Sequence, residues 1–441
     1  ELRKGKSFFS SDKYKNYIFS GFDATEESLA LSEIVELDTS AVYDSTGLFR
    51  THLYKTRFTL DFAQAYYAVD TRYGGQGMAY FLFSDILGDH KLQLGTEMVV
   101  DLQRSDYFLL YRLLPYKIDW NFVFYHLAYQ HNQFTTPNTY LITLYQNIGS
   151  SISASRPFSR FNRIDGEIDF NHIIKSKITP DEYNDYSQQY DEEISHISSF
   201  TTLIPSIKYT WDNALWSYAY PVDGFRYFMK YRTSPVINEK SLTFHSVTMD
   251  GRKYFRLFNG VSFASRFFAG TNWGSGSQKF RLGGVPWLFS SDRYSERFYG
   301  GENAPSVEEL YFSEYVMPLR GVQISNRFGQ NVFLANLELR LPFLIYYFPA
   351  LKYLGQINGV LFTDFGVTWD SEYPKFLDEC NWESTKCDQS QTRTGWLMSY
   401  GFGPRFIFLG MPWQLDYAWQ YNPHKGTITK RQWYLTMGLD F

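Results

Sequence analysis

Apolar and polar side chains alternate along this chain with a period of two, from Arg57 to the last residue. The segment QNVFLANLELRLPF (330–343) shows the pattern clearly, because Asn336, Glu338 and Arg340 fall between apolar residues at the odd-numbered positions. A β-strand directs successive side chains to opposite faces, so this period predicts a strand with one apolar and one polar face. The segment GVLFTDFGVTWD (359–370) alternates in the same way and places Asp364 on its polar face.

Sixteen segments carry this alternation. They are residues 57–67, 77–84, 91–102, 105–114, 117–130, 139–157, 161–175, 200–212, 223–234, 240–249, 253–269, 331–342, 356–369, 393–408, 412–422 and 431–441. Short turns between them, such as the Asp250–Gly251 pair, alternate with connections that include long loops at 176–199, 270–330 and 370–392. This division is typical of bacterial membrane barrels, which have an even number of strands, short periplasmic turns and longer surface loops.

The composition agrees with strands that face lipid on alternate residues. Aromatic residues make up 20% of the 441 residues, yet the mean hydropathy is only −0.34. Interfacial girdles raise the aromatic content of a membrane barrel, whereas a polar lumen keeps its mean hydropathy modest. No run of about 18 apolar residues is present, which argues against a membrane helix. We therefore predict an all-β fold, a transmembrane antiparallel β-barrel of about sixteen strands, over residues 51–441.

One polar constellation stands out within this pattern. It consists of the tetrapeptide LRGV (Leu319, Arg320, Gly321 and Val322), followed by Glu338 and Asp364 on the polar faces of the next two predicted strands. If these strands are neighbours in a barrel, both carboxylates point into the lumen and a loop that carries Arg320 can fold in and bind them. A guanidinium between two carboxylates makes charge-assisted, often bidentate hydrogen bonds. The alternative is that Arg320 is a solvated loop arginine.

This ordered set resembles the membrane barrel of the BamA family, whose members insert or translocate proteins at outer membranes. In that family a surface loop with an Arg-Gly motif reaches into the lumen, and its arginine meets acidic residues in Leu-Glu-Phe and Asp-x-Gly-x-x-Trp contexts. The matching positions here are Arg320, Glu338 in LEL and Asp364 in DFGVTW. Leu319 and Val322 depart from the family's usual Val and Phe, and Val322 removes an aromatic anchor. The resemblance covers residues 281–441 and is weak before them.

The resemblance implies that residues 270–330, here called the motif loop, form a long inward-folded surface loop. Glycine and proline punctuate it, and aromatic residues such as Trp287, Phe298 and Tyr311 occur throughout. A loop of this length in a compact domain is either functional or disordered. Its aromatic content favours a packed plug.

The final segment also resembles a recognition feature of outer-membrane barrels. Its alternate residues on one face are Trp433, Leu435, Met437, Leu439 and Phe441. An aromatic last residue on such a lipid-facing row is similar to the C-terminal signal by which these barrels are themselves recognised for insertion. The alternative, a soluble sheet that ends here, leaves an exposed apolar row without a reason.

Only two cysteines occur, Cys380 and Cys387, in the polar loop 370–392. A disulfide that closes this surface loop is the preferred interpretation, because the exterior is oxidising, and two free thiols are the alternative. No metal site is expected, since neither cysteine has a further Cys or His nearby. The acidic residues in 181–193 are interpreted as a solvated loop face, with bound divalent cations as the alternative.

Residues 1–50 are polar and carry little periodicity, so we expect an N-terminal segment on the periplasmic side of the barrel. The chain begins at Glu1 without a charged start and an apolar core, which predicts that no signal peptide is present. The segment is too short for the tandem periplasmic domains of BamA itself. The sequence leaves open whether periplasmic modules precede this segment.

Catalytic signatures are absent from the sequence. It contains no HExxH, no GxSxG and no phosphate-binding loop, and the DFG at Asp364 lacks the other kinase motifs. We therefore expect no enzyme and no cofactor. The net charge of −4 and the lack of Lys/Arg-rich tracts give no reason to expect a nucleic-acid partner.

The resemblance implies a bacterial outer-membrane protein that inserts or translocates other proteins through lateral opening of the seam between its first and last strands. Expected partners are outer-membrane lipid and lipopolysaccharide, client outer-membrane or secreted proteins, and periplasmic or lipoprotein subunits. The alternative is a non-catalytic barrel that serves as a scaffold or pore subunit of a secretion or surface-lipoprotein assembly. The sequence leaves the choice between insertase and scaffold open.

Overall fold

The structure is a computed structural model. It describes residues 54–70, 74–98, 105–136, 139–184, 189–217, 220–237, 241–258, 260–285, 289–290, 313–342, 357–370, 395–408, 411–422, 427–428 and 431–437. The chain divides into two compact units, Glu1–Lys55 and Thr56–Phe441. The predicted periplasmic segment 1–50 and the two cysteines lie outside the described residues. Among the residues described, no helix has the length and apolar character needed to cross a membrane.

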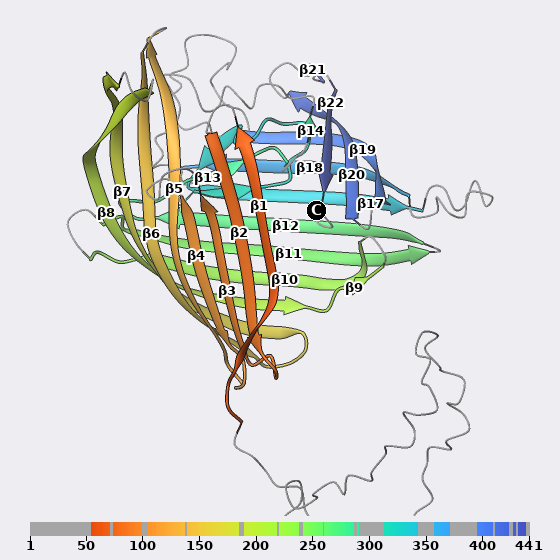
Figure 1. The fold of residues 1–441 in the computed structure, drawn as a ribbon. Helices are drawn as coiled ribbons and strands as arrows, with labels where there is room; N and C mark the ends of the chain where they lie inside the picture. The colour runs from red at the N-terminus through yellow and green to blue at the C-terminus, as the bar shows by residue number, and fades with distance from the viewer. Residues whose placement is uncertain are drawn as a thin grey trace, which may run out of the picture. The chain divides into compact units, whose positions relative to one another are not determined.

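The second unit consists of a large antiparallel sheet with sixteen long strands among its described residues (Figure 1). In the order in which they pair, they are β1 (Phe58–Asp70), β2 (Gly74–Asp85), β3 (His90–Met98), β4 (Asp106–Leu113), β5 (Asp119–Thr136), β6 (Thr139–Pro157), β7 (Asn162–Asn184), β8 (Gln189–Asp212), β10 (Pro221–Ser234), β11 (Phe244–Phe258), β12 (Val261–Trp273), β17 (Asn331–Leu341), β18 (Asn358–Trp369), β19 (Gly395–Phe408), β20 (Met411–Asn422) and β22 (Gln432–Met437). Each of these strands before β22 pairs with the long strand that follows it in sequence.

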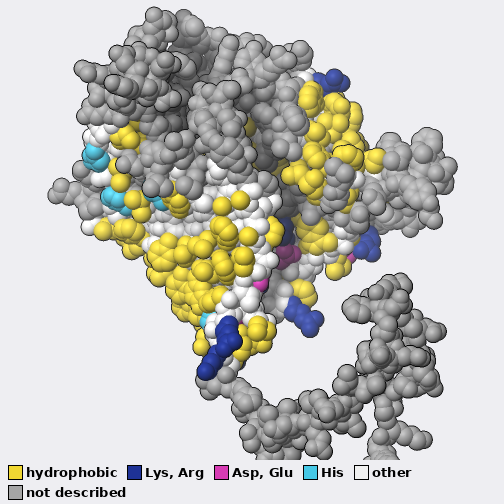
Figure 2. Space-filling model, viewed as in Figure 1, with side chains coloured by type: hydrophobic (Ala, Val, Ile, Leu, Met, Phe, Trp, Pro, Cys, Tyr) yellow, Lys and Arg dark blue, Asp and Glu magenta, His cyan; other side chains and the backbone are white. Residues whose placement is uncertain are grey.

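The two faces of this sheet differ as the alternation predicts. In β17 every second residue is buried, and Asn336, Glu338 and Arg340 belong to the buried set. The opposite face of the sheet exposes large apolar side chains, among them Ile168 in β7 and Phe402 in β19. Figure 2 shows such side chains gathered over the strands near the N-terminal edge of the sheet. A polar inner face and an apolar outer face are typical of a membrane barrel.

The two edges of the sheet are the first and last long strands. Within the described residues, β1 pairs with β2 and no pairing joins it to β22. β22 pairs with β20 on one side and on the other with β14 (Phe289–Ser290), a two-residue strand of the motif loop. Phe289 lies opposite Leu435 in this ladder, and Ser290 lies opposite Tyr434. An internal segment thus occupies part of the edge where β1 would complete a cylinder.

The motif loop builds a second, small sheet. β13 (Phe280–Leu282) lies between β15 (Glu314–Val316), to which it is parallel, and β16 (Arg327–Gly329), to which it is antiparallel. Apolar residues of this loop form one buried cluster with inward-facing residues of the large sheet. The cluster consists of Phe268, Phe280, Leu282, Val316, Leu319, Val322, Val332, Leu334 and Leu397. The loop is therefore packed against the inner face of the sheet.

The predicted turn at Asp250–Gly251 is wrong. β11 continues through both residues to Phe258, and Gly260, with φ of 78°, lies between β11 and β12. An Asp-Gly pair is a frequent hairpin signal. Here Asp250 instead faces inward and binds two arginines, as described below, so its carboxylate has a tertiary role.

The predicted loop 176–199 is also wrong over most of its length. β7 continues to Asn184, and β8 begins at Gln189, with Pro180 paired to Glu192. The charged and proline-containing sequence suggested a loop, because such residues are depleted in strands. The pairing of β7 with β8 continues despite this composition, with register shifts at Lys175/Ser176 and Pro180/Tyr183.

Candidate functional site: the buried clamp of the motif loop

Arg320 is delivered to the inner face of the sheet by a tight turn of the motif loop. Leu319 and Gly284 exchange backbone hydrogen bonds of 2.9 and 3.2 Å, which fix the residue before Arg320. Gly321 follows with φ of 78°, and a Cβ there would lie 3.1 Å from the Ala418 Cβ. The Arg-Gly pair therefore lets the main chain turn tightly against β20 while the arginine extends along the sheet.

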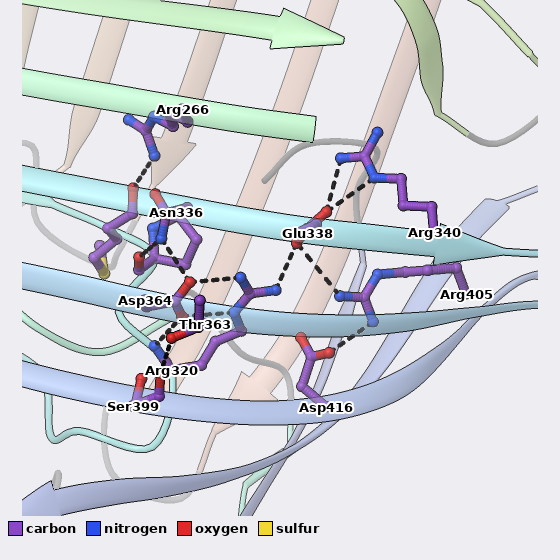
Figure 3. A network of polar contacts seen from close by, with 12 residues as sticks. Arg266, Arg320, Asn336, Glu338, Arg340, Thr363, Asp364, Ser399, Arg405 and Asp416 are labelled. Atoms are coloured by element: carbon purple, nitrogen blue, oxygen red, sulfur yellow. Dashed lines mark hydrogen bonds and ion pairs between the residues drawn. The ribbon is translucent and has the colours of Figure 1, made fainter. Parts of the chain in front are cut away.

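The Arg320 guanidinium bridges two carboxylates on neighbouring strands (Figure 3). Its Nε donates to Asp364 Oδ2 at 2.8 Å and its Nη2 to Asp364 Oδ1 at 2.7 Å, in bidentate geometry. Its Nη1 donates to Glu338 Oε1 at 2.6 Å. Arg320 is 2% exposed, Glu338 3% and Asp364 0%. The structure thus brings together all three residues of the motif and excludes the solvated-loop alternative for Arg320.

Two further wall residues support the same turn. Asn336 on β17 donates its Nδ2 to the Pro318 carbonyl at 2.9 Å and to Asp364 Oδ1 at 2.8 Å. Phe362 on β18 places its ring centroid 3.6 Å from the guanidinium carbon of Arg320. A cation over a ring face that water cannot reach gains electrostatic stabilisation in addition to the ion pairs.

The network extends beyond the predicted triad. Arg340 donates from Nε and Nη2 to Glu338 Oε2 at 2.9 and 2.8 Å, and from Nη1 to the Pro221 carbonyl at 2.9 Å. Arg405 on β19 donates to Asp416 on β20 at 2.7 Å, and its Nη2 lies 4.0 Å from Glu338 Oε1. Sequence reasoning missed these residues, although their period-two position on the inner face was a usable signal.

The electrostatics keep Arg320 charged. Arg320 belongs to the loop and is fully buried; burial by itself lowers its pKa, whereas the charges of Asp364 and Glu338 raise the pKa above its ordinary value. A charge removed from water is stable only when it is paired and hydrogen-bonded. This arrangement fixes a loop to a wall of the sheet.

The other predicted site residues have separate places. Leu319 and Val322 are buried in the apolar cluster, so the smaller Val322 is packed without an aromatic ring. In the last strand, Met437 is exposed on the outer face, opposite in direction to the buried Tyr434. Leu439, Phe441, Cys380 and Cys387 lie outside the described residues. Within the described part of the chain, no cluster of three or more His, Cys, Asp or Glu side chains is arranged to hold a metal ion.

Comparison with protein families decides the classification. The model of the Omp85 superfamily domain matches residues 94–441. The chain belongs to the Omp85 superfamily. Membership makes this chain a β-barrel protein of the bacterial outer membrane. The family resemblance, the all-β barrel fold and the outer-membrane location expected from the sequence are thereby confirmed.

Solved structures of other proteins are similar to this one. BamA from Haemophilus ducreyi lacking POTRA domains 1–3 has 14% sequence identity and a TM-score of 0.53, over 93% of this chain and 78% of that one. CdiB from Acinetobacter baumannii has 12% identity and a TM-score of 0.45, over 87% of this chain and 60% of that one. CdiB from Escherichia coli has 11% identity and a TM-score of 0.46, over 88% and 64%. No curated protein matched the chain in a sequence comparison.

Proposed function

We propose that this Omp85 barrel inserts or translocates other proteins by opening the seam between β1 and β22. A client strand would add to the exposed edge through backbone hydrogen bonds, as in other cases of β-augmentation. The hydrogen bonds lost at the seam would be regained with the client, so the membrane step needs no cofactor and no catalytic residue. Outer-membrane or secreted proteins are the clients in this proposal.

The observation that carries the proposal is the pairing of β14 with β22. Within the described residues, the last strand takes a partner from a distant loop on the edge where the first strand would lie. An unsatisfied strand edge in lipid costs several kcal/mol per backbone group, so β22 requires some partner. A short, replaceable partner supports an exchange mechanism at this edge.

The outer surface supports lipid as a partner. Exposed apolar side chains such as Phe124, Ile152 and Met437 belong to the wall strands. In this proposal the surface ends of the barrel also meet lipopolysaccharide, and periplasmic or lipoprotein subunits bind at the opposite side of the membrane. Residues 1–50 would be the periplasmic segment that precedes the barrel.

A disulfide lock across the seam tests the mechanism. In a Cys380→Ser, Cys387→Ser background, cysteine pairs would be placed between Thr59–Ala65 of β1 and Gln432–Met437 of β22. A pair that crosslinks should abolish function, and reduction should restore it. The control is Ala65→Cys with Ala79→Cys, which locks two strands that are already direct partners. Full activity of a seam-locked protein would exclude lateral opening.

Depletion in the native bacterium separates the insertase from the scaffold alternative. Loss of an insertase should reduce many outer-membrane barrels, measured by quantitative proteomics of the membrane fraction. Loss of a scaffold or pore subunit should reduce the products of one pathway and leave most other barrels at their normal level. The second result would replace the insertase proposal by the scaffold.

A further inference from the structure

A second ion-paired arginine also contacts the motif loop. Arg266 faces inward on β12 and is 6% exposed. Its Nε and Nη2 donate to Asp250 Oδ2 on β11 at 2.9 and 2.7 Å. Its Nη1 donates to the Met317 carbonyl at 2.6 Å, the contact drawn as the dashed line from Arg266 in Figure 3. Met317 precedes Arg320 by three residues. Arg266 therefore reaches the loop from a different pair of strands than Glu338 and Asp364.

Asp250 determines where Arg266 points. Arg252 lies directly opposite Arg266 in the β11–β12 ladder, and like charges in such a pair repel. Asp250 accepts hydrogen bonds from both, at 3.1 and 3.2 Å from Arg252, and so relieves the repulsion. The guanidinium is a rigid planar fork, so two bonds to Asp250 leave Nη1 directed at the loop.

Three side chains of the wall bind consecutive peptide groups of the motif loop. Arg266 binds the carbonyl of Met317, Asn336 binds the carbonyl of Pro318, and Asp364 accepts from the backbone N–H of Arg320 at 3.0 Å. Side chains of β12, β17 and β18 thus hold successive peptide groups of the same turn.

We propose that Arg266 is a positioning residue that fixes the β15 side of the motif loop, with Asp250 as the group that orients it. The Arg320 clamp holds the residues after Pro318, and Arg266 holds those before it. Loss of Arg266 would free the Met317 carbonyl and loosen β13 and β15, while Arg320 stays bound to Asp364. The consequence for client handling rests on the proposed function, but the position of the loop does not.

Hydrogen–deuterium exchange of the purified full-length barrel tests this role. In Arg266→Met, backbone amides of β13 and β15 should exchange about tenfold faster, the effect expected when one hydrogen bond to a charged donor is lost. Amides of 319–322 should change less. In Arg320→Met the order should reverse. Unchanged exchange in β13 and β15 of a folded Arg266→Met protein would overturn the proposal.

A charge exchange separates loop positioning from simple support of the wall. Asp250→Arg with Arg266→Asp restores opposite charges between β11 and β12 but presents a carboxylate to the Met317 carbonyl. Exchange in β11 and β12 should then return toward normal while β13 and β15 remain fast. Recovery of both regions would show that Arg266 acts only through the strand ion pair and would refute a positioning role.

A milder variant covers the case in which the others do not fold. Arg266→Lys keeps the positive charge beside Asp250 but replaces the fork with one ammonium group. It should preserve the strands and raise exchange in β15 relative to wild type. Wild-type exchange in β15 of this variant, together with wild-type client handling, would also count against the fork geometry that the proposal requires.

Discussion

Leu319 of the motif loop packs onto Gly366 of β18, where a Cβ atom would lie only 2.7 Å from Leu319 Cδ1 and 2.8 Å from Leu282 Cδ2. Because Gly366, the glycine of the DFGVTW segment, has no side chain, it leaves the space that the loop side chains fill. Asp364 binds the arginine that follows Leu319, so the same strand provides both the charge and the room for this turn.

Gly366→Ala should displace the loop from the wall. The added methyl group overpacks a buried contact, which costs about 1 to 3 kcal/mol. Protease accessibility of the motif loop in intact cells should rise, and the unfolding midpoint should fall. Gly166→Ala on β7 is the matched control, since a Cβ there meets nothing within 4 Å. Equal behaviour of the two variants would show that the packing of Leu319 on Gly366 is unimportant.

Arg320→Ala should leave the barrel folded but loosen the loop and lower assembly activity. The substitution leaves Asp364 and Glu338 buried without their main partner, and breaking a buried pair in this way costs about 3 to 5 kcal/mol. Heat-dependent mobility on gels reports the fold, and surface proteolysis reports the loop. Arg163→Ala is the control, because Arg163 pairs with Asp165 through a side chain that is 56% exposed. Normal protease resistance with normal function would contradict the clamp.

A cysteine pair at Phe289 and Leu435 should form a disulfide in membranes without distorting the fold. The two residues are direct partners in the β14–β22 ladder, a separation that disulfides bridge. The lock should reduce function, because β14 can then no longer leave the edge of β22. Phe289→Cys with Trp433→Cys, offset by two residues, is the control. Efficient crosslinking with undiminished activity would mean that this edge is not used.

The cysteine loop yields a chemical prediction. If Cys380 and Cys387 form the expected disulfide, the intact protein isolated without reductant should be lighter than the reduced protein by the mass of two hydrogens. Thiol-alkylating reagents should modify neither cysteine before reduction. Alkylation of both under native conditions would establish the free-thiol alternative.

Much of the fold follows from the period of two. The alternation assigns Glu338 and Asp364 to the inner face, and the strand order in the sheet follows the sequence. Local turn chemistry was less informative. Asp250–Gly251 has a strong hairpin composition, yet the ladder continues through it because Asp250 is held by Arg252 and Arg266.

The wider network required three-dimensional information. Arg405 and Asp416 lie on the inner face by alternation alone, but their contact depends on the stagger between β19 and β20, in which Arg405 pairs with Gln414. The Arg266 contact depends on a main-chain carbonyl, which no side-chain pattern reveals. The β14–β22 ladder joins segments far apart in sequence and has no local signal.

The bridge between Gly284 and Leu319 limits how far β14 can lie from the clamp. Phe289 begins β14 only five residues after Gly284, a stretch that spans about 18 Å at most when fully extended. The clamp beside Leu319 thus anchors the chain segment that leads to β14. In the proposed mechanism β14 can leave β22 while the clamp holds, but it stays within this distance of Gly284 and can pair with the same edge again.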